Sequence, residues 1–333
     1  MKKFVAILLT LMLVLGVSAA FADEITSVTL KKNYSLEGNG TSPAETFTFT
    51  SVPASVADAN SATTVETMPN LIGATVSFDG GDAGKGSTKD ITFTLPEYKS
   101  VGTYTYTVTE TASGNAGVTT ETRAFKVRVI VGNGETVGSY KVLSAVAYYG
   151  DQPNETTKAE QMKNTYSAGT LNVTKYVKGN MGDKNKKFDF TVTFTKPADK
   201  NVNSKITAKV AGTDATDFNV AWDDKGTYTY TFQLAHDQTA SFANLPYGVT
   251  YTVTEVDAKE NEKGVLMNGD YEVTKTGDSG TIGAASQTAA FTNTKNGEID
   301  TGVTTENLPY VLLIGFVVLA GAALLIKRKA HNN

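Results

Sequence analysis

One segment of the chain alternates between hydroxyl side chains and aromatic or aliphatic ones: Gly102-Thr103-Tyr104-Thr105-Tyr106-Thr107-Val108-Thr109-Glu110. Residues 188–194, FDFTVTF, alternate in the same way. A period of two is typical of a strand with one buried face, and Thr, Val, Tyr and Phe favour strands. Clusters of Gly, Asn and Asp separate such segments, and no long amphipathic helix lies between the termini. We therefore predict an all-β fold of antiparallel, immunoglobulin-like β-sandwiches.

The chain contains one pattern twice. Residues 28–33 (VTLKKN) resemble residues 171–176 (LNVTKY), residues 102–110 resemble residues 248–255 (GVTYTVTE), and residues 162–165 (MKNT) resemble residues 291–294 (FTNT). The order is Lys, Glu, Asn both times, and the Lys-to-Glu separations are 78 and 80 residues. We predict two related domains, residues 23–168 and residues 169–297, with a boundary near Ser167-Ala168-Gly169.

Six polar residues each end an apolar series on one face of a predicted strand. They are Lys32, Glu110, Asn164, Lys175, Glu255 and Asn293. Lys32, for example, follows Val28 and Leu30 at a spacing of two, and residues at that spacing share a strand face. The alternation therefore predicts that all six point inward. Lys31 competes with Lys32 for this place only if a β-bulge resets the register.

A Lys, a Glu and an Asn together in an apolar core suggest a reaction. Burying a lone charge costs several kcal/mol unless it is compensated, so desolvation lowers the pKa of the amine and raises that of the carboxyl. A neutral amine can attack the Asn side-chain carbonyl while Glu polarises it and carries protons. Ammonia leaves and an amide crosslink joins the first strand of a domain to its last. The alternative is a buried Lys–Glu ion pair with a hydrogen-bonded Asn.

Composition excludes several function classes. The chain has no Cys, so a crosslink of this kind would replace the disulfides of an exported protein. A formal net charge of -4 gives no reason to expect nucleic-acid binding. Two His residues rule out a His-based metal cluster and argue against His-dependent catalysis. We expect no cofactor and no metal.

The N-terminal residues predict export. A basic start, Met1-Lys2-Lys3, precedes an apolar run over residues 4–17 and an A-x-A pattern at Ala20 and Ala22. This arrangement is typical of a signal peptide, here residues 1–22, with the mature chain starting at Asp23. An N-terminal membrane anchor is the alternative, but the apolar run is short for a span.

The C-terminal residues resemble a sortase sorting signal. Residues 298–302 read EIDTG, an apolar stretch over residues 308–326 is long enough to cross a bilayer, and residues 327–333 begin with a basic cluster. The resemblance implies cleavage between Thr301 and Gly302 and transfer of the Thr301 carboxyl to an amine. Asp300 stands directly before Thr301, without the usual Leu-Pro in that form, which leaves the class of sortase open.

At these motifs the mature chain resembles the two-domain backbone pilins of Gram-positive bacteria, of the streptococcal T-antigen type. The shared motifs are the two Lys strands, the two V-T-E segments, the closing M-K-N and F-T-N strands, and E-I-D-T-G. The resemblance implies one autocatalytic isopeptide bond in each domain. By motif, these are Lys32–Asn164 promoted by Glu110, and Lys175–Asn293 promoted by Glu255.

The resemblance also implies covalent polymerisation, in which a sortase joins Thr301 of one subunit to a Lys of the next. That Lys precedes the closing Asn strand of the first domain, which favours Lys158 and leaves Lys163 and Lys141 open. The expected partners are identical subunits, a sortase, peptidoglycan and a host surface ligand, with no nucleic acid. The expected protein is a secreted, wall-anchored pilus backbone subunit, transiently membrane-anchored as a precursor and serving attachment.

Two other functions fit the sequence less well. A monomeric wall-anchored adhesin with isopeptide-stabilised stalk domains would need a binding head, and the two domains use nearly all of the mature chain. A surface glycosidase would need paired carboxylates. The two acids that are predicted to point into an apolar core, Glu110 and Glu255, are already explained by crosslinking. We therefore expect a structural protein and not an enzyme.

Overall fold

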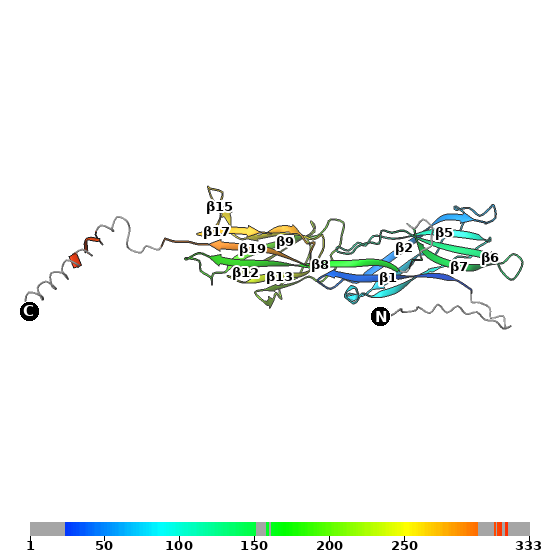
Figure 1. Ribbon diagram of the computed structural model, residues 1–333, viewed down its shortest axis with the longest axis horizontal. Coiled ribbons are helices and arrows are strands. Elements are labelled where there is room, and N and C mark those ends of the chain that lie inside the picture. The colour runs from blue at the N-terminus through cyan, green and yellow to red at the C-terminus, as the bar shows by residue number, and fades with distance from the viewer. Residues whose placement is uncertain are drawn as a thin grey trace, which may run out of the picture. The chain divides into compact units, whose positions relative to one another are not determined.

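The computed structural model describes residues 24–150, 158–159, 161–298, 310, 312–314 and 317–318. The predicted signal peptide, the motif residues from 299 to 302, the basic tail and most of the predicted membrane segment lie outside these residues. Among the residues described, no helix has the length and apolar character needed to cross a membrane. The strands of Figure 1 confirm the all-β expectation for the described part of the chain.

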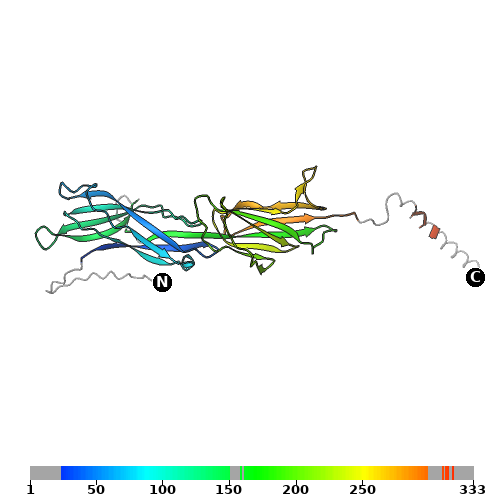
Figure 2. The ribbon, with the colours of Figure 1, turned by 180° about the vertical axis from the view of Figure 1, so that it is seen from behind.

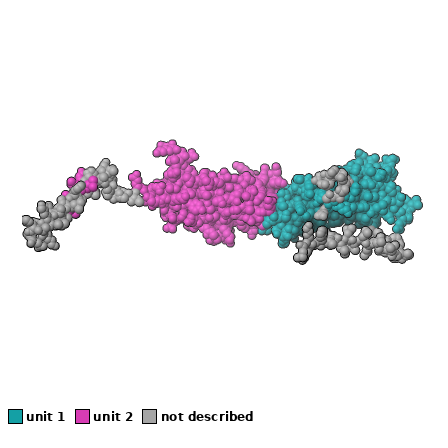
Figure 3. Space-filling view, viewed as in Figure 1, with its two compact units in different colours: residues 1–36, 41–114, 118–166 teal, residues 37–40, 115–117, 167–333 magenta. Residues whose placement is uncertain are grey.

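The chain divides into two compact units, coloured separately in Figure 3. The first unit comprises residues 1–36, 41–114 and 118–166, and the second comprises residues 37–40, 115–117 and 167–333. The long strand β8 (Gln161–Lys178) contributes its first residues to the first unit and the rest to the second.

The first unit is a sandwich of two sheets. One sheet has the strand order β3-β2-β5-β6-β7, and in the other β1 pairs with both β4 and β8. The strands are β1 (Ser27–Gly38), β2 (Glu45–Ala57), β3 (Ala74–Phe78), β4 (Thr88–Thr94), β5 (Gly102–Glu110), β6 (Phe125–Asn133) and β7 (Tyr140–Tyr149). Edge-to-face contacts among Tyr34, Phe47 and Phe78 fill the space between the sheets, because alternation turns these aromatic side chains inward.

The second unit repeats the sandwich. One sheet has the order β11-β10-β13-β8-β19-β17-β16-β15, and the facing sheet has the order β12-β9-β14-β18. The strands are β9 (Phe188–Thr195), β10 (Thr207–Val210), β11 (Thr213–Asp214), β12 (Thr227–Leu234), β13 (Thr239–Pro246), β14 (Thr250–Glu255), β15 (Lys259–Glu260), β16 (Leu266–Asn268), β17 (Tyr271–Thr276), β18 (Ser279–Thr281) and β19 (Ser286–Thr294). Phe190, Phe232 and Phe242 are among the buried aromatic residues of its core.

The pairing of β19 with β8 departs from the antiparallel expectation. β19 runs parallel to β8, with Phe291 opposite Lys175 and Asn293 opposite Val177. The orange β19 lies beside the green β8 from the front and from behind (Figure 1 and Figure 2). Parallel neighbours need a long crossover between them, and here the rest of the second unit forms that connection. The pairing sets a Lys strand directly beside an Asn strand.

Candidate functional site

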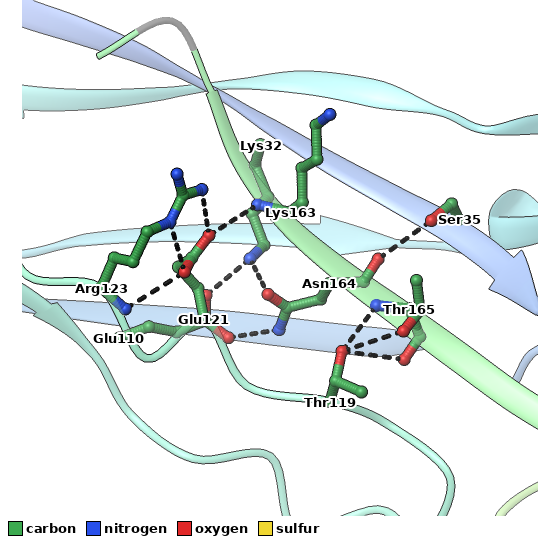
Figure 4. A network of polar contacts seen from close by, with 9 residues as sticks. All are labelled: Lys32, Ser35, Glu110, Thr119, Glu121, Arg123, Lys163, Asn164 and Thr165. Carbon is green, nitrogen blue, oxygen red and sulfur yellow. Dashed lines mark hydrogen bonds and ion pairs between the residues drawn. The ribbon is translucent and has the colours of Figure 1, made fainter. Parts of the chain in front are cut away.

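The first unit brings together Lys32, Glu110 and Asn164 (Figure 4). The Lys32 Nζ lies 2.5 Å from Glu110 Oε2 and 2.5 Å from Asn164 Oδ1. The Asn164 Nδ2 donates a hydrogen bond to the other carboxylate oxygen, Glu110 Oε1. The three side chains thus form a closed ring in which the Lys nitrogen faces the amide that it could attack.

Strand alternation explains why these residues meet. Lys32 in β1 follows the buried Val28 and Leu30, and its side chain is fully buried, while Lys31 is exposed and pairs with Asp90. Glu110 is the last residue of β5, and its side chain is also fully buried. Asn164 in β8 is 1% exposed. The interpretation that Lys32, rather than Lys31, points inward is therefore confirmed.

The surroundings of this cluster favour uncharged groups. The Lys32 Nζ lies 4.4 Å from the ring centre of Phe47 and 5.6 Å from that of Phe49. Burial lowers the pKa of Lys32 although Glu110 opposes the shift, and burial raises the pKa of Glu110 although Lys32 opposes it. Both shifts make transfer of a proton from the amine to the carboxyl easier, which leaves a nucleophilic amine beside a carboxylic acid.

Residues between β5 and β6 form hydrogen bonds to β8 on both sides of Asn164 in the sequence. The Thr119 N–H donates to Thr165 O at 2.9 Å, and the Thr165 N–H donates to Thr119 Oγ1 at 2.8 Å. Glu121 accepts the Lys163 N–H at 3.4 Å and is itself held by Arg123 through contacts of 3.0 and 2.8 Å (Figure 4). The sequence reasoning missed Thr119 and Glu121, since loop residues follow no periodicity that would place them beside Asn164.

The second unit brings together Lys175, Glu255 and Asn293. The Lys175 Nζ lies 2.7 Å from Glu255 Oε2, and the Asn293 Nδ2 donates to Glu255 Oε1 at 2.5 Å. Lys175 and Asn293 have no measurable exposure, and Glu255 is 2% exposed. The Asn293 Oδ1 is buried and has no hydrogen-bond partner among the described residues. In this cluster the Lys175 amine contacts one oxygen of Glu255, and the side-chain nitrogen of Asn293 contacts the other.

Burial also dominates the electrostatics of the second cluster. The Lys175 Nζ lies 4.1 Å from the ring centre of Phe188 and 5.5 Å from that of Phe190. Desolvation lowers the pKa of Lys175 to about 8, although Glu255 acts in the opposite direction, and the nearby Lys186 lowers it further. Lys175 can thus exchange a proton near neutral pH.

Asn268 joins the second cluster and was not foreseen from the sequence. Its Nδ2 donates to Glu255 Oε1 at 2.8 Å and to the backbone carbonyl of Val256 at 3.0 Å. Asn268 ends β16 and pairs with Tyr271, so Gly269 and Asp270 form a two-residue hairpin turn, in which Gly269 has a positive φ. The turn explains the backbone at this position but not the use of the Asn268 side chain.

None of the three candidate polymerisation lysines contributes its side chain to a described contact of either cluster. Lys158 is exposed and forms a β-bridge with Tyr148, Lys163 is an exposed residue of β8, and Lys141 lies in β7 at a surface groove. Thr301 and Gly302 lie outside the described residues. In the part of the chain that the structure describes, no group of three or more His, Cys, Asp and Glu residues could hold a metal ion.

The fold and the clusters define a class: tandem β-sandwich domains, each with a buried Lys–Glu–Asn cluster between its first and last strands. Comparison with known proteins agrees with this class. Residues 28–167 match the family described as Spy0128-like isopeptide containing domain, and residues 169–295 match a domain family of unknown function (DUF7601).

The chain is 29% identical over 277 residues to a curated pilin of Streptococcus pyogenes serotype M1, covering 76% of each protein. It shares its fold with the major pilin from Streptococcus pyogenes at a TM-score of 0.52 and 23% identity, covering 82% of this chain and 99% of that one. For the major pilin protein T3.2 the TM-score is 0.51 at 20% identity, with 82% and 100% covered. The chain is thus similar in sequence to a curated pilin over most of its length, and it shares the fold of two streptococcal major pilins.

Proposed function

We propose that this chain is the structural backbone subunit of a covalently polymerised cell-surface pilus, with one Lys–Asn isopeptide bond in each domain. The similarity to curated and structurally characterised pilins supports the pilus assignment. The observation that carries the crosslinking proposal is the contact of Lys32 Nζ with both Glu110 and Asn164 inside an apolar core. The chain acts as a building block and not as an enzyme.

The crosslinking step follows from the geometry. Lys32 passes one proton to Glu110, and its lone pair then attacks the Asn164 side-chain carbon. The C–N bond to the Asn164 nitrogen breaks, and that nitrogen takes a second lysine proton and leaves as ammonia. The third proton stays on the new amide nitrogen, so atoms and charge balance with the carboxyl left protonated. Burial of the pair lowers the cost of the first transfer, and the fold supplies the orientation.

The same step in the second domain uses Lys175, Glu255 and Asn293. Glu255 Oε2 contacts the Lys175 amine, and Oε1 contacts the side-chain nitrogen of Asn293. One carboxyl group therefore contacts both the amine that loses protons and the nitrogen that leaves as ammonia. The bond would join β8 to its parallel neighbour β19. Since the chain has no Cys, these bonds would supply covalent reinforcement that reducing agents cannot remove.

Polymerisation would use the exposed lysines outside the clusters. In the proposed assembly, a sortase cleaves between Thr301 and Gly302 and joins the Thr301 carboxyl to Lys158 of an identical subunit. Lys158 is exposed, as an acceptor amine must be. The final subunit is joined to peptidoglycan, and the pilus serves attachment to a host surface.

The intact mass of residues 23–301 expressed in a host without sortase tests the crosslinking proposal. We expect a mass lower than that of the sequence by two ammonia molecules, with peptide mapping placing the bonds at Lys32–Asn164 and Lys175–Asn293. A folded protein of full mass would show that the clusters are ordinary buried polar groups. In that case the proposed pilus subunit would have no covalent crosslink within its domains.

A further inference from the structure

The Glu255 carboxylate has an asymmetric set of contacts. Its Oε1 accepts hydrogen bonds from two side-chain amides, Asn293 at 2.5 Å and Asn268 at 2.8 Å, while its Oε2 contacts Lys175 at 2.7 Å. A carboxylate oxygen has two lone pairs in the carboxyl plane, so two donors occupy Oε1. A proton on Glu255 would therefore reside on Oε2, the oxygen that faces the lysine.

Asn268 itself is held in one orientation. Its Nδ2 carries two hydrogens, and the structure uses both, one toward Glu255 and one toward the Val256 carbonyl at 3.0 Å. The backbone of β16 is also paired on both sides, because Met267 lies opposite Lys259 of β15 and Asn268 lies opposite Tyr271 of β17. The amide is thus a rigid support for the carboxyl and not a surface group that happens to lie nearby.

The first domain has no counterpart to this contact among its described hydrogen bonds to Glu110. There, Glu110 Oε1 accepts a hydrogen bond from Asn164, and Oε2 accepts one from Lys32. The neighbouring Glu121, paired with Arg123, instead accepts the backbone N–H of Lys163 in the strand that carries Asn164. The two domains therefore support their clusters in different ways, which offers an internal comparison within one chain.

We propose that Asn268 is a positioning residue for the second crosslink: it holds the Glu255 carboxyl so that Oε2 exchanges the proton with Lys175 while Oε1 faces the leaving nitrogen of Asn293. This inference rests on the proposed Lys175–Asn293 bond. Asn268 touches neither reacting atom, and it acts only through the orientation of Glu255. Without it, the carboxyl can rotate out of the orientation in which one oxygen contacts the amine of Lys175 and the other contacts the side-chain nitrogen of Asn293.

The test follows the two crosslinks in time within the same chain. Residues 23–301 are synthesised in a cell-free system, synthesis is stopped, and samples are denatured at intervals for peptide mapping. We expect Asn268→Ala to slow the Lys175–Asn293 bond about tenfold or more, the typical effect of losing a hydrogen bond to a charged group. The Lys32–Asn164 bond should form at the unchanged rate.

Asn261→Ala is the matched control. Asn261 lies in the same β15–β16 hairpin and caps its turn, accepting the N–H groups of Lys263 at 2.9 Å and Val265 at 3.0 Å, but it does not contact Glu255. We expect this variant to form both bonds at the unchanged rate. Equal slowing by Asn261→Ala and Asn268→Ala would mean that only hairpin stability matters and would overturn the inference.

Asn268→Asp separates positioning from a loss of folding. The side chain keeps its size, but a second carboxylate now lies beside Glu255 and favours the protonated state of the Lys175–Glu255 pair. We expect the high-pH limb of the rate profile for the second bond to move to higher pH. An unmoved profile, or a wild-type rate in Asn268→Ala, would overturn the role of Asn268. Absence of the Lys175–Asn293 bond in the unmodified chain would overturn the proposed crosslink itself.

Discussion

Lys32 Nζ and Asn164 Oδ1 lie 2.5 Å apart, although 132 residues separate them in the chain. Lys32 is in β1 and Asn164 is in β8, which pair within one sheet. A bond between them would close a loop containing nearly all of the first domain. Loops of this length lose the most conformational entropy when they are closed in the unfolded chain.

Substitution of neighbouring lysines should distinguish the buried from the exposed side chain. We expect Lys32→Ala to abolish the first crosslink and to leave the mass one ammonia higher. Lys31→Ala should leave both crosslinks intact, because Lys31 points to solvent and pairs with Asp90. Intact mass spectrometry of both variants measures this. Retention of the bond in Lys32→Ala would mean that another amine serves the site.

Each acid should serve only its own domain. We expect Glu110→Gln to prevent the Lys32–Asn164 bond and Glu255→Gln to prevent the Lys175–Asn293 bond, because Gln keeps the size but cannot take up the lysine proton. Peptide mapping of each variant should find the other bond complete. Loss of both bonds in either variant would instead indicate a folding defect.

Loss of the first crosslink should lower the stability of the first domain. Closing a loop of 132 residues stabilises a fold by about 5 kcal/mol in the chain-entropy description. We expect Asn164→Ala to lose at least this much, measured by denaturant unfolding under reducing conditions. Glu110→Gln keeps both side chains of the missing bond, so a similar loss in that variant would assign the effect to the bond.

The rate of the second crosslink should fall as the pH rises through about 8. The reaction needs one shared proton on the Lys175–Glu255 pair, which starts on the amine and, once transferred, makes Glu255 a carboxylic acid beside Asn293. Because burial lowers the pKa of Lys175 to about 8, the pair loses this proton above that pH. Cell-free synthesis followed by incubation between pH 6 and pH 10 measures the rate. A rate that keeps rising above pH 8 would show that the proton is not required.

The polymerising lysine can be identified in cells that express a sortase. We expect Lys158→Arg to remove the ladder of covalent polymers, while Lys163→Arg and Lys141→Arg keep it. Immunoblots of wall extracts measure the ladder. Loss of the ladder in one of the other variants would move the acceptor to that lysine, and a single band from the unmodified chain would favour a monomeric adhesin.

Periodicity predicted much of the fold and the inward direction of the cluster residues. Lys32, Lys175 and Asn293 each end an apolar series at a spacing of two, and all are buried as predicted. This succeeds because a strand allows only two side-chain directions, so one buried neighbour determines the direction of the next. The repeated order of Lys, Glu and Asn then associated the residues in each domain.

The parallel pairing of β8 with β19 could not be read from the sequence. Alternation in a strand reports which face is buried, but it is the same for parallel and antiparallel neighbours. The direction of a neighbouring strand depends on how the chain returns to it, and that return involves the whole second domain.

The sequence by itself determined the chemistry of this protein: a strand period of two, the inward Lys, Glu and Asn residues, and the absence of Cys. Only the tertiary structure decided which neighbours hold these groups, namely Asn268 at Glu255 and Glu121 beside Asn164. Asn268 ends a short strand at a turn and Glu121 lies in a loop. At such places no periodicity sets the direction of a side chain, so its partner is determined by the packing of distant segments.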